Sequence, residues 1–374
     1  MKSRSQNHST IIIGAGHCGL AMAHELAVRG EGFLMLEAGP APGSSWNSRW
    51  ESLELFTPAG HDGLPGRKFP ARRGTFPTAG AVFDYLQSYA AAFEMPIQTS
   101  TTANHLEVGA EGEFSVQTTM GTFSSSRVVV ATGVHQVPKI PELAKQISED
   151  TSQLHSSDYR NPALIPDGPV AVVGFGTSGA QIACELASSH EVTICGRPTP
   201  HVPEGLIRYA PALYWFLVHR LLTRSTPAGR KVAQRIFTRG APLIRVSTQD
   251  VESAGVTRAG RVDAVRDGVM VAQDGTPIEA STIIWATGYR PDYSWIEGLR
   301  TDEHGYPFHH RGISAEIPGL GFLGIPFQYG LTSGIIGGAG RDARYLARRL
   351  APGPAEVPEI GVIPDAGGRA TERD

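Results

Sequence analysis

The sequence predicts an α/β fold built from two similar halves, because its most distinctive segments occur twice. A glycine-rich turn at 14–19 follows the apolar run 11–13, and a second turn at 174–179 follows the apolar run 170–173. Each half then continues into a group of short alternating strands and ends on an Ala-Thr-Gly segment. We therefore expect two Rossmann-like dinucleotide-binding domains, each with a parallel sheet and an inserted β-meander.

The first turn has the glycine spacing that a dinucleotide requires. Gly14 lets the strand turn sharply, Gly16 lets the backbone approach a pyrophosphate, and Gly19 lets the helix pack closely on the strand. The helix N-terminus that follows offers free N–H groups and partial positive charge to the phosphates. Glu37 ends the next predicted strand, about 20 residues further on, where an acid can bind a ribose hydroxyl.

The second turn repeats the pattern with Gly174, Gly176 and Gly179, but the residue after its next strand is different. Arg197 stands where an acid would be expected. A carboxylate there would repel a 2′-phosphate, whereas a guanidinium pairs with it, so this half favours NADPH over NADH. The alternative is that Arg197 is an ordinary surface arginine.

The Ala-Thr-Gly segments at 131–133 and 286–288 end the last predicted strand of each half. Their small residues let the backbone come close to a cofactor. Before each of them we expect the strands of a meander, bounded by glycine-containing turns. These strands are predicted at 105–108, 114–118 and 122–123 in the first half, and at 261–266, 268–272 and 276–278 in the second.

Three further segments resemble one family of flavoproteins. The segment 46–58 is similar to its flavin-covering loop, 154–159 to the second half of its fingerprint, and 324–329 to the segment that returns to the flavin. Together with the two turns, they make the chain resemble the flavin-containing monooxygenases (class B flavoprotein monooxygenases), in a YUCCA-like bacterial branch. Of the family fingerprint, only the half His155-x-x-x-Tyr159 is present.

This resemblance implies bound FAD and NADPH. In the family, a C4a-hydroperoxyflavin passes one oxygen atom of dioxygen to a small organic substrate, either to nitrogen or sulfur or beside a carbonyl. The residues that match cofactor-binding positions are Gly14, Gly16, His17, Cys18, Gly19, Glu37, Trp46, Thr132 and Gly133 for FAD, and Gly174, Gly176, Thr177, Ser178, Gly179, Arg197, Thr287 and Gly288 for NADPH or the junction.

Two residues are the catalytic candidates that the resemblance implies. Thr57 stands where many animal-type members have an asparagine, and it would donate a hydrogen bond to the oxygenated flavin. Gln328 would orient the substrate or the nicotinamide. The alternative for both is an indirect role behind the residues that touch the cofactor.

The domain organisation that follows is discontinuous. We expect an FAD-binding domain at 1–165 and 285–350, an NADPH-binding domain at 166–284, and a loose tail at 351–374. The segment 209–222 is apolar on nearly every face. It is predicted to be a helix that is buried in the fold or at a dimer interface, with a wall of the substrate entrance or peripheral membrane contact as alternatives.

Composition excludes several other classes. A formal net charge of −3 and the lack of a basic arm argue against nucleic-acid binding. The three cysteines form no Cys-x-x-Cys pair, which excludes a redox disulfide of the reductase type, and the histidines show no metal-binding spacing. No signal peptide or stretch of about 20 apolar residues is found, so we expect a cytoplasmic protein without an integral membrane segment.

Three functions fit these features. The first is an NADPH- and oxygen-dependent monooxygenase that acts on a small molecule. The second is an NADPH oxidase or flavin reductase without productive oxygen transfer, and the third is a non-catalytic flavin redox sensor. The substrate is not encoded in any motif, and a homodimer is left open.

Overall fold

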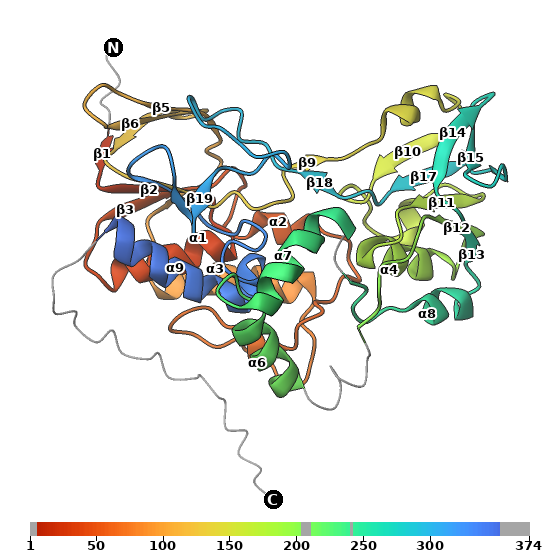
Figure 1. The fold of residues 1–374 in the computed structure, drawn as a ribbon, viewed down its shortest axis with the longest axis horizontal. Helices are drawn as coiled ribbons and strands as arrows, with labels where there is room; N and C mark the ends of the chain where they lie inside the picture. Colours follow the sequence, from red (N-terminus) through yellow and green to blue (C-terminus); the bar gives the residue numbers. More distant parts are fainter. Residues whose placement is uncertain (1–5, 203–210, 240–241, 352–374) are drawn as a thin grey trace, which may run out of the picture.

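The computed structural model describes residues 6–202, 211–239 and 242–351, and these form two α/β units joined by a narrow ribbon (Figure 1). Of the tail expected at 351–374, residues 352–374 lie outside the described residues, as do the first residues of the apolar segment at 209–222. Among the described helices, none combines the length and the apolar character needed to cross a bilayer.

The first unit has a seven-stranded sheet whose centre is parallel and completely buried. Its order is β19 (His309–His310), β20 (Ile313–Ser314), β21 (Leu320–Phe322), β8 (Val128–Val130), β2 (Thr10–Ile13), β3 (Phe33–Leu36) and β4 (Ile97–Gln98). The strands from β21 to β4 run parallel, while β19 and β20 add an antiparallel edge. Continuous β-branched runs such as 11–13 suit strands that are covered on both faces.

Helices cover one face of this sheet, and a meander covers the other. The helices are α1 (His17–Ala27), α2 (Ser44–Asn47), α3 (Ala79–Ala92) and α9 (Ile336–Leu350), with short 3-10 helices η1 (Ala59–His61) and η4 (Leu331–Gly334). The meander is a four-stranded sheet of β1 (Gln6–His8), β7 (Gly121–Ser125), β6 (Phe114–Thr118) and β5 (Ala103–Val108). Along β2, Ile12 packs with the helices, while Ile11 and Ile13 pack with the meander.

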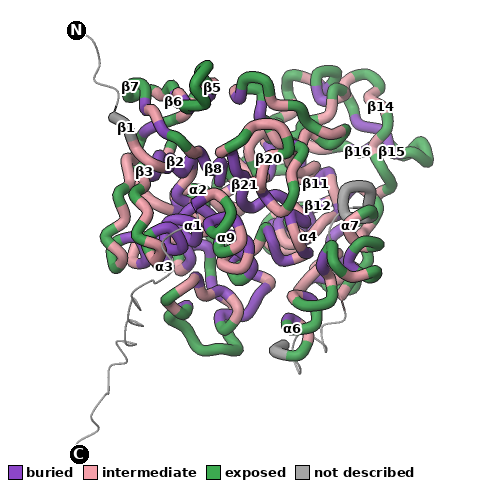
Figure 2. Tube along the Cα trace, turned by 60° about the vertical axis from the view of Figure 1, so that its left-hand side comes forward, coloured by how far each residue is buried: buried purple, intermediate pink, exposed green. Residues whose placement is uncertain are grey.

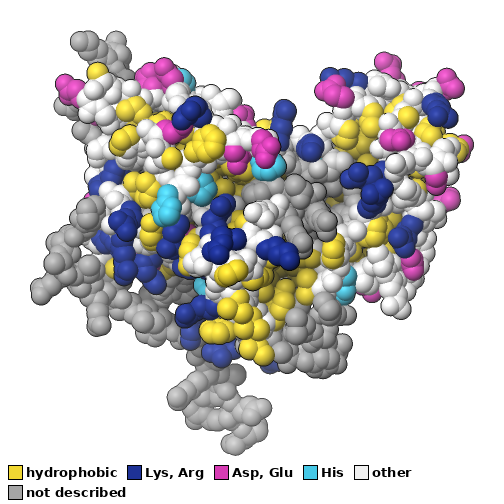
Figure 3. Space-filling view, in the orientation of Figure 1, with side chains coloured by type: hydrophobic (Ala, Val, Ile, Leu, Met, Phe, Trp, Pro, Cys, Tyr) yellow, Lys and Arg dark blue, Asp and Glu magenta, His cyan; other side chains and the backbone are white. Residues whose placement is uncertain are grey.

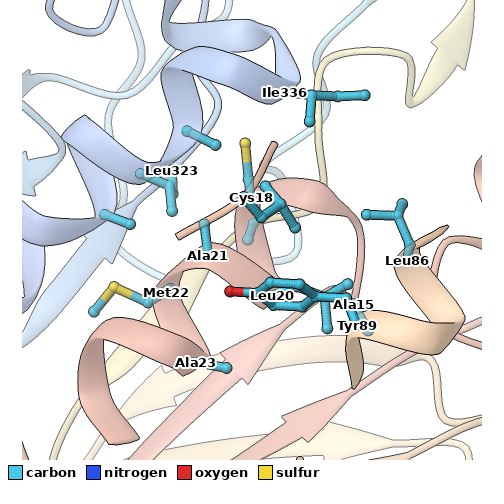
Figure 4. Packing of buried hydrophobic residues seen from close by; sticks show 14 of the residues in the cluster. Ala15, Cys18, Leu20, Ala21, Met22, Ala23, Leu86, Tyr89, Leu323 and Ile336 are labelled. Atoms are coloured by element: carbon cyan, nitrogen blue, oxygen red, sulfur yellow. The ribbon is translucent and has the colours of Figure 1, made fainter. Parts of the chain in front are cut away.

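The core of the first unit lies between α1, α3, α9 and the sheet. Figure 4 shows Cys18 and Met22 of α1 beside Leu323 and Ile336, with Tyr89 of α3 beneath. In Figure 2 the same region is the most continuous stretch of buried chain. This packing holds the N-terminus of α1 rigidly at the carboxyl edge of the sheet.

The second unit repeats this arrangement. Its sheet is entirely parallel, in the order β10 (Ser152–His155), β17 (Thr282–Trp285), β11 (Val170–Val173), β12 (Val192–Cys195) and β13 (Thr257–Ala259). One face is covered by α4 (Thr177–Leu186) and α8 (Thr248–Ser253), and the other by the meander β14 (Val262–Arg266), β15 (Val269–Ala272) and β16 (Pro277–Ile278), with η2 (Glu142–Gln146). The predicted fold class, with two parallel sheets and two meanders, is confirmed.

The two crossings between the units pair with each other. Strands β9 (Val137–Pro138) and β18 (Tyr289–Arg290) form a two-stranded antiparallel ribbon, seen between the units in Figure 1. His155 lies beside it, and its Nε2 is 2.9 Å from the Gly288 carbonyl oxygen. A second connection comes from Arg245, whose guanidinium pairs with Glu54 at 2.8 Å and donates to the Leu55 carbonyl at 2.9 Å.

Two segments depart from the expected domain boundaries. Strand β10 at 152–155 belongs by hydrogen bonding to the second sheet, although it precedes the boundary expected at 165; η3 (Pro162–Leu164) follows it. Helices α6 (Pro211–Leu221) and α7 (Pro227–Arg239) were expected within the NADPH domain, but the chain around them packs on the first unit. Sequence position alone could not show this, because the insertion reaches across from one unit to the other.

Candidate functional site

The first glycine turn forms an open cradle at the carboxyl edge of the first sheet. Gly14 has φ 105°, and a Cβ there would lie 2.6 Å from the Ala131 carbonyl oxygen. A Cβ on Gly19 would collide with the Gly14 carbonyl. At Gly16, in contrast, a Cβ would meet nothing within 4 Å. The outer glycines are therefore needed for packing, while the middle one faces free space of the kind that a pyrophosphate needs.

The second turn has the same design. A Cβ on Gly174 would collide with the Ala286 carbonyl, and one on Gly179 with the Gly174 carbonyl, whereas Gly176 again has nothing within 4 Å. The helices that follow, α1 and α4, begin without a side-chain cap among the described residues. Their first N–H groups are therefore available to an anion.

Each Ala-Thr-Gly segment lies directly beside its glycine turn. Strands β2 and β8 are paired up to Ile13 and Val130, and β11 and β17 up to Val173 and Trp285, so both segments leave the same sheet edge as the turns. Gly133 and Gly288 have φ 77° and 80°, and a Cβ on either would meet nothing within 4 Å. The two halves therefore present matching pairs of backbone turns, and these fit two dinucleotides.

The polar residues of the first cradle are arranged around its turn. Glu37 follows β3 and accepts from the backbone N–H groups of Ala15 at 2.7 Å and Gly39 at 2.8 Å, so its carboxylate is held at the turn. His17 begins α1, and burial lowers the pKa of its imidazole to about 4, which leaves it neutral at pH 7. Its Nε2 is buried and has no partner within the described chain, and its ring lies 6.3 Å from that of Trp46.

Cys18 is a packing residue. Its side chain is 4% exposed and contacts Leu323 and Ile336 in the core (Figure 4). Burial raises the pKa of its thiol to about 12, so the thiol stays protonated. Of Cys18, only the backbone N–H at the start of α1 is suited to bind a phosphate.

Thr57 is buried and bonded to an acid that sequence reasoning did not single out. Its hydroxyl donates to Oδ1 of Asp62 at 2.6 Å. Asp62 is 0% exposed, and its Oδ2 has no partner among the described residues. Burial raises the pKa of the Asp62 carboxyl to about 7, with the Thr57 bond opposing the rise. The only sequence signal was that Asp62 is the one acid in the stretch 55–65.

Gln328 has both ends of its amide engaged by backbone groups. Its Oε1 accepts from Gly324 N–H at 3.1 Å, and its Nε2 donates to the Arg311 carbonyl at 3.4 Å. The preceding Phe327 has φ 54°, and its carbonyl accepts from Arg224 Nε at 2.7 Å. Gln328 thus stabilises a tight, strained turn, with one hydrogen bond to backbone at each end of its amide. Its catalytic role stays a prediction.

The polar residues of the second cradle are more exposed. Arg197 follows Gly196 just beyond the end of β12, and it is exposed. Ser178 is exposed, and Thr177 donates to the Pro242 carbonyl at 3.3 Å. At the crossings, Thr287 donates to the Lys139 carbonyl, and the exposed Thr132 accepts from Gln136 at 2.6 Å. The cofactor-binding roles of these residues stay predictions.

Helix α6 covers the part of the first unit that contains Thr57. Trp215 is 6% exposed and stacks on Phe56, with ring centroids 6.2 Å apart, and it lies 6.4 Å from the ring of His61. His219 on the same face is 3.0 Å from the Thr332 hydroxyl. Leu213 and Phe216 are 59% and 55% exposed, so α6 is not fully buried within this chain. The other roles considered for 209–222, a dimer interface, a wall of the substrate entrance and peripheral membrane contact, stay predictions.

These two cradles have the geometry of a known family. Residues 11–205 match the family model described as pyridine nucleotide-disulphide oxidoreductase. The chain belongs to this family. The described cysteines Cys18, Cys184 and Cys195 are free, and burial raises the pKa of both Cys18 and Cys195 to about 12.

Individual relatives narrow the class. An uncharacterized oxidoreductase CzcO-like of Geobacillus kaustophilus is 35% identical over 90% of this chain and 96% of its own length. The indole-3-pyruvate monooxygenase YUCCA1 of Oryza sativa is 29% identical over 81% of each chain. A solved flavin-containing monooxygenase from Stenotrophomonas maltophilia has a TM-score of 0.74 at 26% identity, over 93% of this chain and 99% of its own. The predicted resemblance is confirmed, and the protein is an oxidoreductase of the flavin-dependent monooxygenase type.

Proposed function

We propose that this protein is an FAD-containing, NADPH- and oxygen-dependent monooxygenase that transfers one oxygen atom to a small organic substrate. The observation that carries the proposal is the pair of matching cradles, each with its middle glycine open to a ligand. Two dinucleotides bound at once are what electron transfer between them requires. The bound cofactors would supply hydride transfer from nicotinamide to flavin and the activation of dioxygen.

FAD is assigned to the first cradle. Gly16, the N-terminus of α1 and Gly133 would face its pyrophosphate and linker, and Glu37 would hold the ribose. The unpartnered Nε2 of His17 supports this assignment, because a buried polar atom without a partner is costly unless a ligand completes it. We assign the FAD-binding domain to the segments 1–165 and 285–350, with β10 supplied to the other sheet.

NADPH is assigned to the second cradle, within the domain at 166–284. Gly176, Thr177 and Ser178 at the start of α4 would bind the pyrophosphate. Arg197 is exposed where a 2′-phosphate would lie if the adenosine follows β12, and this supports NADPH over NADH. Thr287 and Gly288 lie at the crossing that both units share.

The remaining residues control water and protons beside the flavin. Trp215 of α6 stacks on Phe56 and lies beside His61, and it would exclude water from the segment 56–62. The hydroxyl oxygen of Thr57 and Oδ1 of Asp62 lie 2.6 Å apart and share a hydrogen bond. The ionisation of Asp62 therefore decides whether the Thr57 hydroxyl donates to the carboxylate or toward a ligand. Thr57 therefore keeps its proposed role as a donor only while Asp62 carries the proton.

The test is a balance of NADPH, oxygen and product. The purified yellow protein is mixed with NADPH and isotopically labelled dioxygen in the presence of amines, sulfides, ketones or 2-oxo acids. Labelled product formed in proportion to NADPH consumed supports the proposal. Hydrogen peroxide in full yield with every substrate would identify an oxidase, and failure of NADPH to reduce the flavin would leave a redox sensor; either result contradicts the proposal.

A further inference from the structure

Helix α6 has two apolar faces, and the structure covers only one of them. Trp215 and Val218 are 6% and 5% exposed and face the first unit. On the other side of the helix, large apolar side chains remain open to solvent. Their exposed fractions are 59% for Leu213, 55% for Phe216, 41% for Leu217 and 50% for Leu221.

The exposed apolar residues form one continuous stripe. Positions separated by three, four and eight residues share a face of an α-helix, and 213, 216, 217 and 221 have this spacing. Figure 3 shows the result as a hydrophobic patch over α6 at the lower centre of the molecule, with Lys and Arg side chains beside it. Four adjacent large side chains in solvent are unusual for a monomeric soluble protein and indicate an interaction surface.

The charge around the stripe identifies the kind of partner. The segment 211–239 holds six Lys and Arg residues and no Asp or Glu, in a chain whose formal net charge is −3. Arg220 lies over the Phe216 ring at 5.6 Å, and Lys231 on α7 is exposed. An apolar stripe flanked by cations matches a surface with apolar tails below anionic head groups.

We propose that the α6–α7 hairpin, through the stripe of Leu213, Phe216, Leu217 and Leu221, docks the protein on an anionic lipid surface. Helix α6 would lie in the plane of the interface, with its stripe among the acyl chains and Arg220 and Lys231 at the phosphates. This goes beyond the proposed oxygen transfer and does not depend on it. A second copy docked through the same face is disfavoured, because two segments that carry only positive charge would repel each other.

Docking of this kind has a consequence for the site. The inner face of α6 lies against Phe56 and His61, so these residues would lie about one helix diameter, roughly 10 Å, from the lipid surface. The catalytic unit would then be held next to molecules dissolved in the membrane.

The experiment is co-sedimentation of the full-length, flavin-loaded protein with two kinds of vesicle. One is pure phosphatidylcholine, and the other is equal parts phosphatidylcholine and phosphatidylglycerol. We expect binding to the anionic vesicles that weakens with added salt, and at least about tenfold less binding to the neutral ones. Equal binding to both vesicles, or binding to neither, would overturn the proposal.

Matched variants test the surface itself. Phe216→Ser combined with Leu217→Ser should lower the partition coefficient on anionic vesicles at least about tenfold, and Arg220→Glu combined with Lys231→Glu should do the same. The control is Met120→Ser combined with Leu164→Ser, which removes apolar side chains that are 63% and 66% exposed on other elements. Unchanged flavin content and circular dichroism show that each variant is folded.

Light scattering of the wild type and the same variants tests whether the stripe is instead an interface between two copies of this chain. If the wild-type protein is a dimer that Phe216→Ser with Leu217→Ser converts to a monomer, the stripe is an interface between copies and the lipid proposal is wrong. The lipid proposal is also wrong if the α6 variants bind anionic vesicles as well as the wild type does, or if the control variant loses binding to the same extent.

Discussion

Replacing Asp62 with asparagine is expected to raise the free energy of unfolding relative to the wild type, and this gain should be larger at pH 8 than at pH 4. The wild-type carboxyl is 0% exposed, and its Oδ2 has no partner among the described residues. Asparagine has the same shape and can keep the bond to Thr57, but it cannot ionise. The pH-dependent part of the stability change therefore reports the cost of a buried charge at this position.

The size of the effect follows from the burial of Asp62. Its ordinary pKa is 3.8, and in the folded protein burial raises this pKa to about 7. Each pKa unit corresponds to about 1.4 kcal/mol, so ionisation in the folded state costs about 4 kcal/mol. Because the folded pKa is raised, the contribution of Asp62 to the stability of the wild type is largest below pH 4, and this amount is lost as the pH rises from about 4 to 7. The asparagine variant does not.

The assay is chemical denaturation of the wild type and the Asp62→Asn variant at a series of pH values between 4 and 8. The free energy of unfolding of the variant, taken relative to the wild type, should rise by about 4 kcal/mol across this range. Asp84→Asn is the matched control, because Asp84 is exposed on the neighbouring helix α3. An infrared carboxyl band that disappears near pH 7 in the wild type alone would identify the group directly.

Two results would refute this reasoning. One is a relative stability of the Asp62→Asn variant that does not change between pH 4 and pH 8, since this would mean that the carboxyl titrates at its ordinary pKa. The other is a carboxyl band near pH 7 that persists in the variant, since another acid would then be its source. Either result would also contradict the proposal that the Asp62 carboxyl carries a proton near pH 7 and so leaves the Thr57 hydroxyl able to donate to a ligand.

Three further predictions concern the cradles and the turn before α9. Gly16→Ala should leave the thermal unfolding midpoint of the apoprotein nearly unchanged but weaken FAD binding at least about tenfold. Gly14→Ala should instead destabilise the apoprotein by more than about 2 kcal/mol, because its Cβ would lie 2.6 Å from a carbonyl oxygen. The reverse order of effects would contradict the assignment of Gly16 as open and Gly14 as packed. Arg197→Ala should raise the KM for NADPH about tenfold and leave the KM for NADH unchanged, and an equal change in both would make it an ordinary surface residue. Gln328→Leu should cost about 1–3 kcal/mol of stability, because it leaves the N–H of Gly324 buried without a partner. A variant with full stability but no oxygen transfer would instead indicate that Gln328 contacts the substrate directly.

Much of the fold was predictable because its signals are local. A strand, a turn with three spaced glycines and a helix form a unit whose backbone geometry depends on a few adjacent residues. The same holds for the meanders, where Asp-Gly and similar pairs mark the turns. The apolar run 170–173 predicted a buried strand without any knowledge of its neighbours, and β11 is found there. Repetition of the whole pattern then predicted two units.

The candidate catalytic residues were less predictable, because their roles depend on partners that are brought together only by folding. Thr57 was singled out on family resemblance, and its bonding partner Asp62 became visible only in the structure. Gln328 was singled out to orient the substrate or the nicotinamide, and its hydrogen bonds to the backbone of Gly324 and Arg311 became visible only in the structure. A hydrogen-bond partner is a matter of atomic distance, and sequence spacing does not report it even for Thr57 and Asp62, which are five residues apart.

By itself, the sequence determined the two dinucleotide cradles, the absence of a Cys-x-x-Cys pair and the arginine after the second cradle, since each depends on residue type and short spacing. Only the tertiary structure decided that the insertion 211–239 crosses to the first unit, that one face of α6 remains open to solvent, and that Asp62 is buried. The reason is physical: burial and its effect on pKa are set by every atom within contact distance, and most of those atoms come from distant parts of the chain.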